Sequence, residues 1–202
     1  MTMRTQKGRM LLISGPSGSG KSSICRELQR DPAVVFSVSA TTRAPRAGEI
    51  DGVHYHFITP ERFRELQRQG AFIESAEVHG NLYGTLREPM EKALEDGQVY
   101  LVEIDVQGAL QLKGLDVPGL YVFVDVPDLD ELRRRLEVRG TDSHDVVDRR
   151  LQKAQVERAE RDKYDHVVIN RDFAAALREV CRIAGLSEQE TSEPKTSEQG
   201  IH

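Results

Sequence analysis

The sequence predicts a three-layer α/β fold, in which helices cover both faces of a parallel β-sheet. Two observations carry this prediction. Short apolar runs, such as residues 99–104 and 120–124, are rich in β-branched side chains and are typical of strands that are buried on both faces. Longer helical segments separate these runs, and strands that alternate with helices favour a parallel sheet.

The first quarter of the chain starts this alternation. Residues 10–13 are apolar and lead into a Ser-Gly pair, as expected for a buried strand that ends in a glycine turn. Residues 21–30 suit a helix, and a proline shortly after them closes it. We expect a second strand at residues 34–40, followed by a loop over residues 41–52.

The next segment departs from the alternation. Residues 55–57 are β-formers, and a helix is expected at residues 60–69 because a proline is tolerated in the first turn. Residues 72–78 read as a strand, and residues 80–84 as a tight, irregular connection. Short strands without full helices between them indicate a small, partly antiparallel insertion in the parallel domain.

The remaining elements restore the alternation as far as a polar tail. They are helices at residues 88–96, 128–138, 143–160 and 173–184 and strands at residues 99–104, 120–124 and 167–169. Two charge-rich helices within residues 133–161 suggest a second insertion. We expect a flexible N-terminus over residues 1–8 and a disordered tail over residues 186–202, because both lack an apolar pattern.

Composition excludes several classes of protein. The 202 residues include 33 acidic and 28 basic side chains, and the net charge of −5 disfavours a general nucleic-acid binder. No apolar run approaches the roughly 18 residues that span a bilayer, and the N-terminus has no secretory pattern. Two cysteines without CxxC spacing disfavour a disulfide framework. We expect a cytoplasmic protein with no nucleic-acid or membrane partner.

A phosphate-binding loop is the first candidate site. The residues that we assign to it are Gly15, Pro16, Ser17, Gly18, Ser19, Gly20, Lys21, Ser22 and Ser23. The first eight match the pattern G-x-x-x-x-G-K-[ST], between a predicted strand and a predicted helix. Glycines let successive N–H groups surround a phosphate, Lys21 adds a positive charge, and the Ser22 hydroxyl can complete a magnesium shell. The loop predicts binding of a nucleoside triphosphate.

A second cluster of positive charge follows. Arg43 and Arg46 lie three residues apart on a loop that Pro45 stiffens, and two guanidinium groups so placed can hold a phosphate or a carboxylate. Taken alone, the segment is equally compatible with a solvated surface loop.

Seven segments together resemble the guanylate kinases, in the order of that family. They are FSVSATTRAPRAGE (36–49), DGVHYHF (51–57), FIESA (72–76), YGT (83–85), EIDVQG (103–108), RLEVRGT (135–141) and VIN (168–170). The resemblance covers about residues 8–185. It implies a P-loop three-layer core with a parallel sheet (9–36, 87–132 and 162–185), a small mixed-β GMP-binding insertion (about 37–86) and a helical lid (about 133–161).

The resemblance also implies an activity, the transfer of a phosphoryl group from MgATP to GMP or dGMP. The positions that match the clamp on the GMP phosphate are Arg43, Arg46, Tyr55 and Tyr83, and those that match the guanine site are Ser39, Glu74, Thr85 and Asp105. Physical chemistry agrees, because the N1–H and 2-amino donors of guanine suit one carboxylate. Adenine would leave Glu74 buried without those donors.

Carboxylates and arginines complete the predicted site. Glu103 and Asp105 follow a buried strand, where ligands bind in open α/β sheets; one could serve magnesium through water and the other guanine. By resemblance, Arg135, Arg139 and Arg150 belong to a lid over the triphosphate. The resemblance implies four catalytic residues, which are Lys21, Arg43, Arg139 and Arg150. Asn170 is expected near the adenine or ribose. The other arginines of residues 133–161 are expected on solvated helix faces.

Three alternatives remain open from the sequence alone. A kinase for another small acceptor would keep the phosphate loop but not the guanine-reading residues. A guanylate-kinase-like scaffold that binds peptides would have lost loop or clamp residues, whereas all are present here. A P-loop motor on nucleic acid would need basic grooves and more chain. The sequence leaves open whether the protein is a monomer or a homodimer.

Overall fold

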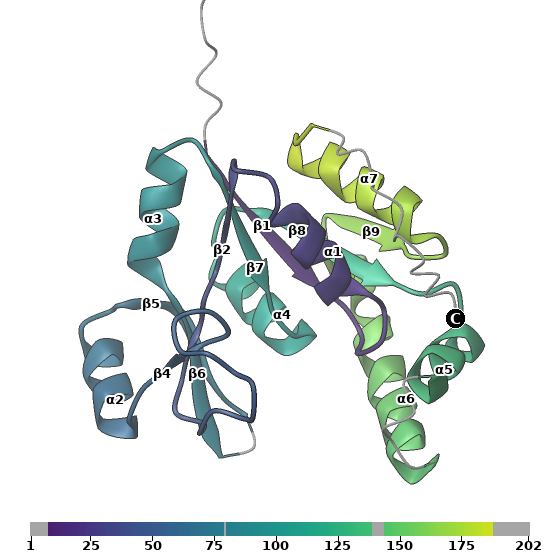
Figure 1. Cartoon of the computed structure of the whole chain (residues 1–202), viewed down its shortest axis with the longest axis horizontal. Helices are drawn as coiled ribbons and strands as arrows, with labels where there is room; N and C mark the ends of the chain where they lie inside the picture. The colour runs from purple at the N-terminus through teal and green to yellow at the C-terminus, as the bar shows by residue number, and fades with distance from the viewer. Residues whose placement is uncertain (1–7, 79, 139–143, 188–202) are drawn as a thin grey trace, which may run out of the picture.

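A computed structural model of the chain describes residues 8–78, 80–138 and 144–187. Its centre is a parallel sheet of five strands in the order β2-β7-β1-β8-β9 (Figure 1). The strands are β1 (Arg9–Ser14), β2 (Val34–Phe36), β7 (Val99–Glu103), β8 (Leu120–Asp125) and β9 (His166–Ile169). Because β1 is the middle strand, the glycine-rich loop that follows it opens at the centre of one sheet edge.

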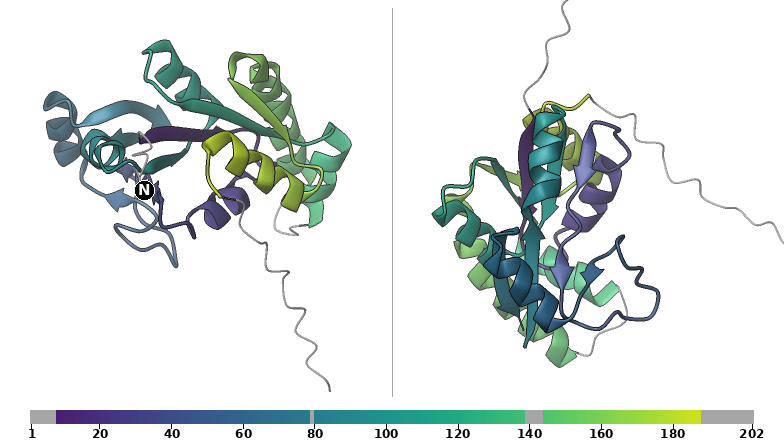
Figure 2. Two further views of the ribbon diagram at one scale, coloured as in Figure 1. Left: turned by 90° about the horizontal axis from the view of Figure 1, so that it is seen from above. Right: turned by 90° about the vertical axis from the view of Figure 1, so that its left-hand side faces the viewer.

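Helices cover both faces of this sheet, as Figure 2 shows from two further directions. The helices α1 (Lys21–Leu28) and α7 (Phe173–Ala184) cover one face, and α3 (Arg87–Glu95) and α4 (Val106–Gly114) cover the other. Side chains of β1 alternate between the two cores, with Leu11 and Ile13 on the α1 side and Met10 and Leu12 on the α4 side. The predicted fold class is confirmed.

A smaller mixed sheet of four strands follows, in the order β4-β3-β6-β5. Its elements are β3 (Ala40–Thr41), β4 (His56–Phe57), β5 (Phe72–Val78), β6 (Asn81–Leu86) and the helix α2 (Pro60–Arg68). The β3–β4 pair is parallel, and the other two pairs are antiparallel. Phe63 of α2 stacks on Phe72 of β5 with ring centroids 4.5 Å apart, which gives this sheet a small core of its own.

Two expectations about this region were wrong. Residues 34–40 are not one strand, because β2 belongs to the large sheet and β3 to the small one. Residues 80–84 are not an irregular connection, since most of them belong to β6. Gly84 of that strand lies against the Phe72 ring, where a Cβ atom would be 2.8 Å from Cδ1. This glycine therefore serves close packing between two strands rather than a turn.

Two helices, α5 (Leu129–Val138) and α6 (His144–Ala159), pack on each other through a third apolar cluster and lie at the lower right of Figure 1. A 3-10 helix, η1 (Arg161–Lys163), then leads to β9. The division into core, insertion and lid stays a prediction, and most of the predicted terminal segments lie outside the described residues. No helix in the described ranges is long and apolar enough to cross a membrane.

A buried ion pair ties α6 to the large sheet. The Asp125 carboxylate, at the end of β8, is fully buried. Arg158 Nε lies 2.8 Å and 3.0 Å from its two oxygens, and the Val126 N–H donates a hydrogen bond to Oδ1. Arg161 Nη1 lies 3.5 Å away. Arg158 was expected on a solvated face, but its side chain is only 17% exposed. The pair fixes the base of α6 where it meets the core.

Substituting Asp125→Asn should lower the free energy of unfolding by about 3 kcal/mol, the lower end of the range for breaking a buried ion pair, measured by urea titration. The substitution leaves the largely buried guanidinium of Arg158 without its counter-charge. The destabilisation is at the lower end because part of the Arg158 side chain reaches water. The matched control is Arg133→Ala, which breaks an ion pair with Asp148 in which both side chains are about half exposed. That variant should lose less than about 1 kcal/mol. Equal losses in both variants would contradict the anchoring role.

Candidate active site

The loop between β1 and α1 has the backbone of a phosphate cradle. Gly15, Gly18 and Gly20 have φ values of 142°, 95° and 96°, which side-chain-bearing residues rarely adopt. A Cβ atom on Gly15 would lie 2.1 Å from the Val124 carbonyl oxygen, so the loop also runs too close to β8 for any larger residue. The N-terminus of α1 follows at Lys21, and its unpaired N–H groups attract an anion at this point.

The same loop is held from the side of β9 and α5. The Ser19 carbonyl accepts hydrogen bonds from Asn170 Nδ2 at 2.7 Å and from Arg135 Nη1 at 3.4 Å. Arg135 also donates from Nη2 to the Asn170 carbonyl at 2.7 Å. The structure thus places Asn170 and Arg135 against the loop backbone, where both orient the cradle.

Lys21 and Ser22 face the carboxyl end of β7. The Ser22 hydroxyl donates to Glu103 Oε1 at 2.5 Å, and Lys21 Nζ donates to the Pro16 carbonyl at 3.4 Å. Burial lowers the pKa of Lys21, and the nearby carboxylates of Glu103 and Glu157 oppose this shift. Because the Lys21 ammonium is poorly hydrated at the mouth of the cradle, it can bind the negative charge of a phosphate strongly.

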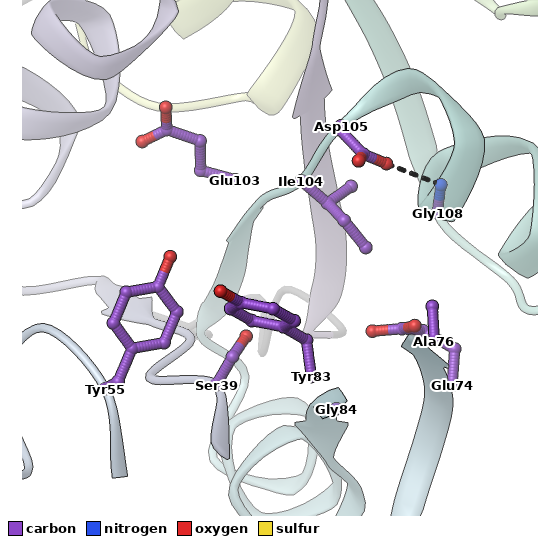
Figure 3. A pocket seen from close by; sticks show the side chains of 10 residues that line it. All are labelled: Ser39, Tyr55, Glu74, Ala76, Tyr83, Gly84, Glu103, Ile104, Asp105 and Gly108. Atoms are coloured by element: carbon purple, nitrogen blue, oxygen red, sulfur yellow. Dashed lines mark hydrogen bonds between the residues drawn. The ribbon is translucent and has the colours of Figure 1, made fainter. Parts of the chain in front are cut away.

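A cavity of about 280 Å³ opens between the two sheets. Its polar lining consists of Ser39, Tyr55, Glu74, Tyr83, Glu103 and Asp105. Figure 3 shows the Tyr55 and Tyr83 hydroxyls and the Glu74 carboxylate turned toward the space below Glu103 and Asp105. The structure therefore brings together six of the residues that the sequence proposed for the GMP side.

Glu74 is the deepest acid of this cavity. Only 7% of it is exposed, and its Oε1 atom accepts a hydrogen bond from Thr85 Oγ1 at 2.7 Å. Burial raises the pKa of Glu74, while the Thr85 hydroxyl holds the shift back. Asp105 has a second task, because its Oδ1 atom accepts the Gly108 N–H at 2.8 Å and caps α4. Asp105 uses one oxygen for this cap, and both carboxylates line the cavity.

Arg43 packs against Tyr55, one of the two tyrosines that line the cavity. Its guanidinium carbon lies 5.5 Å from the centroid of Tyr55 and 5.7 Å from that of Phe57, in contact with both rings. Tyr55 and Tyr83 meet edge to face, with centroids 6.0 Å apart. Arg46 is exposed on the same loop, so both predicted clamp arginines come from one turn.

A larger hollow of about 570 Å³ connects the cradle with this cavity. Lys21 and Ser22 line one end and Tyr55 the other, and both hollows share Glu103 and Asp105. Arg150 lies partly buried on α6, whereas Arg139 lies outside the described residues. The arrangement can hold two anionic ligands end to end, with the carboxylates of the β7 edge between them.

The family model described as guanylate kinase matches residues 7–185. The chain belongs to the guanylate kinase family. Its relatives include guanylate kinases of Shewanella oneidensis (47% identity over 175 residues, covering 86% of this chain and 84% of the relative) and Rubrobacter xylanophilus (45% over 179 residues, 88% and 94%). The crystal structure of guanylate kinase from Anaplasma phagocytophilum superposes with a TM-score of 0.71 at 32% identity, covering 92% of this chain and 89% of that one. The predicted resemblance to guanylate kinases is confirmed.

Several side chains of this family member had no assigned role in the sequence. Phe57 and Glu49 both contact Arg43, and Glu157 contributes negative charge near Lys21. Glu49 stands three residues after Arg46, between Gly48 and Gly52, and the glycines are a weak signal of a turn. Glu157 lies among alternating charges of α6, and nothing in the sequence distinguishes it from its exposed neighbours.

Proposed function

We propose that this protein transfers the γ-phosphoryl group of ATP to GMP, or to dGMP, and so produces ADP and GDP. Family membership supports a nucleotide phosphotransferase. The observation that carries the choice of acceptor is Glu74, a buried carboxylate that Thr85 orients at the end of a cavity continuous with the phosphate cradle. Guanine offers two adjacent N–H donors to such a group, and no other common base does.

On the ATP side, we assign the β- and γ-phosphates to the backbone N–H groups of the loop over residues 15–23, Pro16 excepted, and to the Lys21 ammonium. Arg135 and Asn170 contribute by holding the Ser19 carbonyl; a direct contact of Asn170 with adenine or ribose stays a prediction. Arg139 and Arg150 are assigned to the lid, where they would close over the transferred group and exclude water, which would otherwise hydrolyse ATP.

Magnesium fits the cradle. The Ser22 hydroxyl and the Glu103 carboxylate are hard oxygen donors 2.5 Å apart, and magnesium in such sites needs few protein ligands because phosphates and waters supply the rest. This agrees with the described residues, which contain no group of three or more His, Cys, Asp or Glu side chains that could hold a metal alone. When bound, the ion would neutralise phosphate charge. Ser22 and Glu103 would hold it, and this leaves Asp105 for guanine.

On the GMP side, we assign the phosphate to Arg43, Arg46, Tyr55 and Tyr83. We assign the base to Glu74, with Ser39, Thr85 and Asp105 as its neighbours. A phosphate oxygen of GMP attacks the γ-phosphorus in line, and the bond to the β,γ-bridging oxygen of ATP breaks. The GMP phosphate is anionic at neutral pH, so no general base is needed. Positioning and neutralisation of charge supply the rate.

The test is the release of ADP from MgATP with GMP, dGMP, AMP, CMP and UMP as parallel acceptors. Rapid release with GMP and dGMP alone is the expected result. Release with another acceptor would make this a different nucleotide kinase. If none of the five acceptors gives ADP release in a protein that still binds ATP, GMP is not the acceptor. If the protein does not bind ATP either, the result would favour a scaffold protein without catalytic activity. A cytoplasmic location, where both nucleotides are present, is part of this proposal.

A further inference from the structure

The side chain of Glu49 makes more contacts with the GMP-side loop than its place in the sequence suggests. Its Oε1 atom accepts a hydrogen bond from Arg43 Nη2 at 2.8 Å, and its Oε2 atom accepts the Arg46 N–H at 2.7 Å. The Glu49 N–H donates in turn to the Arg46 carbonyl at 3.0 Å. One carboxylate therefore joins the two arginines of the proposed phosphate clamp.

The Arg43 guanidinium is fixed from several directions by these contacts. Glu49 holds Nη2, the Ala44 carbonyl accepts from Nη1 at 2.7 Å, and the rings of Tyr55 and Phe57 lie beside the guanidinium. Only 14% of the Arg43 side chain and 18% of the Glu49 side chain remain exposed. A guanidinium has five N–H donors, and Tyr83 also lies within hydrogen-bonding reach, so at most three donors remain for a ligand.

We infer that Glu49 is a positioning residue, which orients Arg43 before GMP arrives so that its remaining N–H groups meet the phosphate. This inference rests on the proposed function, because it takes the phosphate of GMP as the ligand of Arg43. The hydrogen bonds of Arg43 and the Arg46 N–H lower the pKa of Glu49 to about 2, so the carboxylate stays ionised at any assay pH.

Two opposing effects decide the direction of a substitution. Without Glu49, the Arg43 side chain gains rotamer freedom, and ordering it again on binding costs a factor of about 30 in affinity. The negative charge of Glu49 also repels the phosphate, but the Arg43 guanidinium paired with it offsets most of that charge, so the repulsion costs only about threefold. Orientation outweighs repulsion, so Glu49→Ala should raise the KM for GMP roughly tenfold.

The experiment compares four measured quantities in Glu49→Ala and Glu49→Gln: KM for GMP, KM for ATP, kcat, and the inhibition constant of guanosine, which has no phosphate. Glu49→Ala should raise KM for GMP about tenfold and leave the other three within about twofold. Glu49→Gln keeps one acceptor, which can serve Arg43 while its NH2 group faces the Arg46 N–H, so its KM for GMP should rise less than that of Glu49→Ala, by about threefold. The control is Glu65→Ala, which makes the same chemical change in a more exposed ion pair with Arg62 on α2, with no contact to Arg43.

A double substitution separates orientation from loop stability. If Glu49 acts through Arg43, adding Glu49→Ala to Arg43→Ala should change GMP binding by less than about twofold. An unchanged KM for GMP in Glu49→Ala, or an equal loss of guanosine affinity, would overturn the inference. So would a tenfold effect that persists without Arg43. Titration of GMP by calorimetry gives the same comparison without turnover, so an inactive wild-type protein would count against the proposed function and not against Glu49.

Discussion

Replacing Lys21 by alanine is expected to lower kcat/KM for phosphoryl transfer about 10³- to 10⁵-fold, the loss that follows removal of comparable charged groups in phosphoryl transfer. Lys21 stands at the mouth of the cradle, where burial lowers its pKa and weakens its hydration. A poorly hydrated ammonium interacts strongly with the charge that spreads over the transferred group. The measurement is ADP release from MgATP with saturating GMP, followed over a range of ATP concentrations.

Stability separates this effect from unfolding. A lysine whose pKa is lower in the folded than in the unfolded state destabilises the folded state while it is charged. Its removal should therefore leave the unfolding temperature unchanged or raised at neutral pH. The control is Lys92→Ala, which removes the same charge from an exposed position of α3 and should keep full activity. A Lys21→Ala protein with more than about a tenth of wild-type activity would contradict the assignment.

The phosphate cradle was predictable because all of its chemistry lies in nine consecutive residues. Gly15, Gly18 and Gly20 require positive φ values, and their spacing before Lys21 is visible in the sequence, although Asn170 and Arg135 also hold the folded loop. The end of β7 was predictable for a similar reason: a buried apolar run that stops at Glu103 places that acid at the open edge of a parallel sheet. In both cases a short stretch of sequence was sufficient, because a strand and the loop at its end are formed by consecutive residues.

Contacts between distant residues explain what the sequence did not reveal. Gly84 reads as a turn residue until Phe72, twelve positions earlier, is seen to pack on it. Arg158 lies in a run of charges that resembles a solvated helix face, and only the fold brings it to Asp125. Glu49 is only six positions from Arg43, but their contact depends on how a loop without regular secondary structure folds back on itself. In each case the deciding partner is set by tertiary structure, which a single sequence does not display.

Replacing Glu74 by glutamine is expected to lower kcat/KM for GMP about 10²- to 10⁴-fold, because two charge-assisted hydrogen bonds to guanine are lost or reversed. The amide of glutamine presents a donor where guanine also presents donors, so one contact becomes repulsive. Inosine monophosphate, which lacks the 2-amino group, is the informative second acceptor. The wild type should prefer GMP over it strongly, and the preference should shrink toward unity in Glu74→Gln.

The folded protein itself should tolerate this change. Burial raises the pKa of Glu74, so its ionised form destabilises the folded state, an effect that is absent below the unfolded pKa and grows as pH rises through the folded pKa. Glu74→Gln should therefore unfold at the same temperature or higher at neutral pH. The control Glu77→Gln makes the same chemical change at an exposed position of β5 and should keep both activity and base preference. A Glu74→Gln protein that still prefers GMP over inosine monophosphate by the wild-type factor would mean that another group reads the 2-amino position. Asp105, whose second carboxylate oxygen also faces the cavity, would then be the residue to substitute.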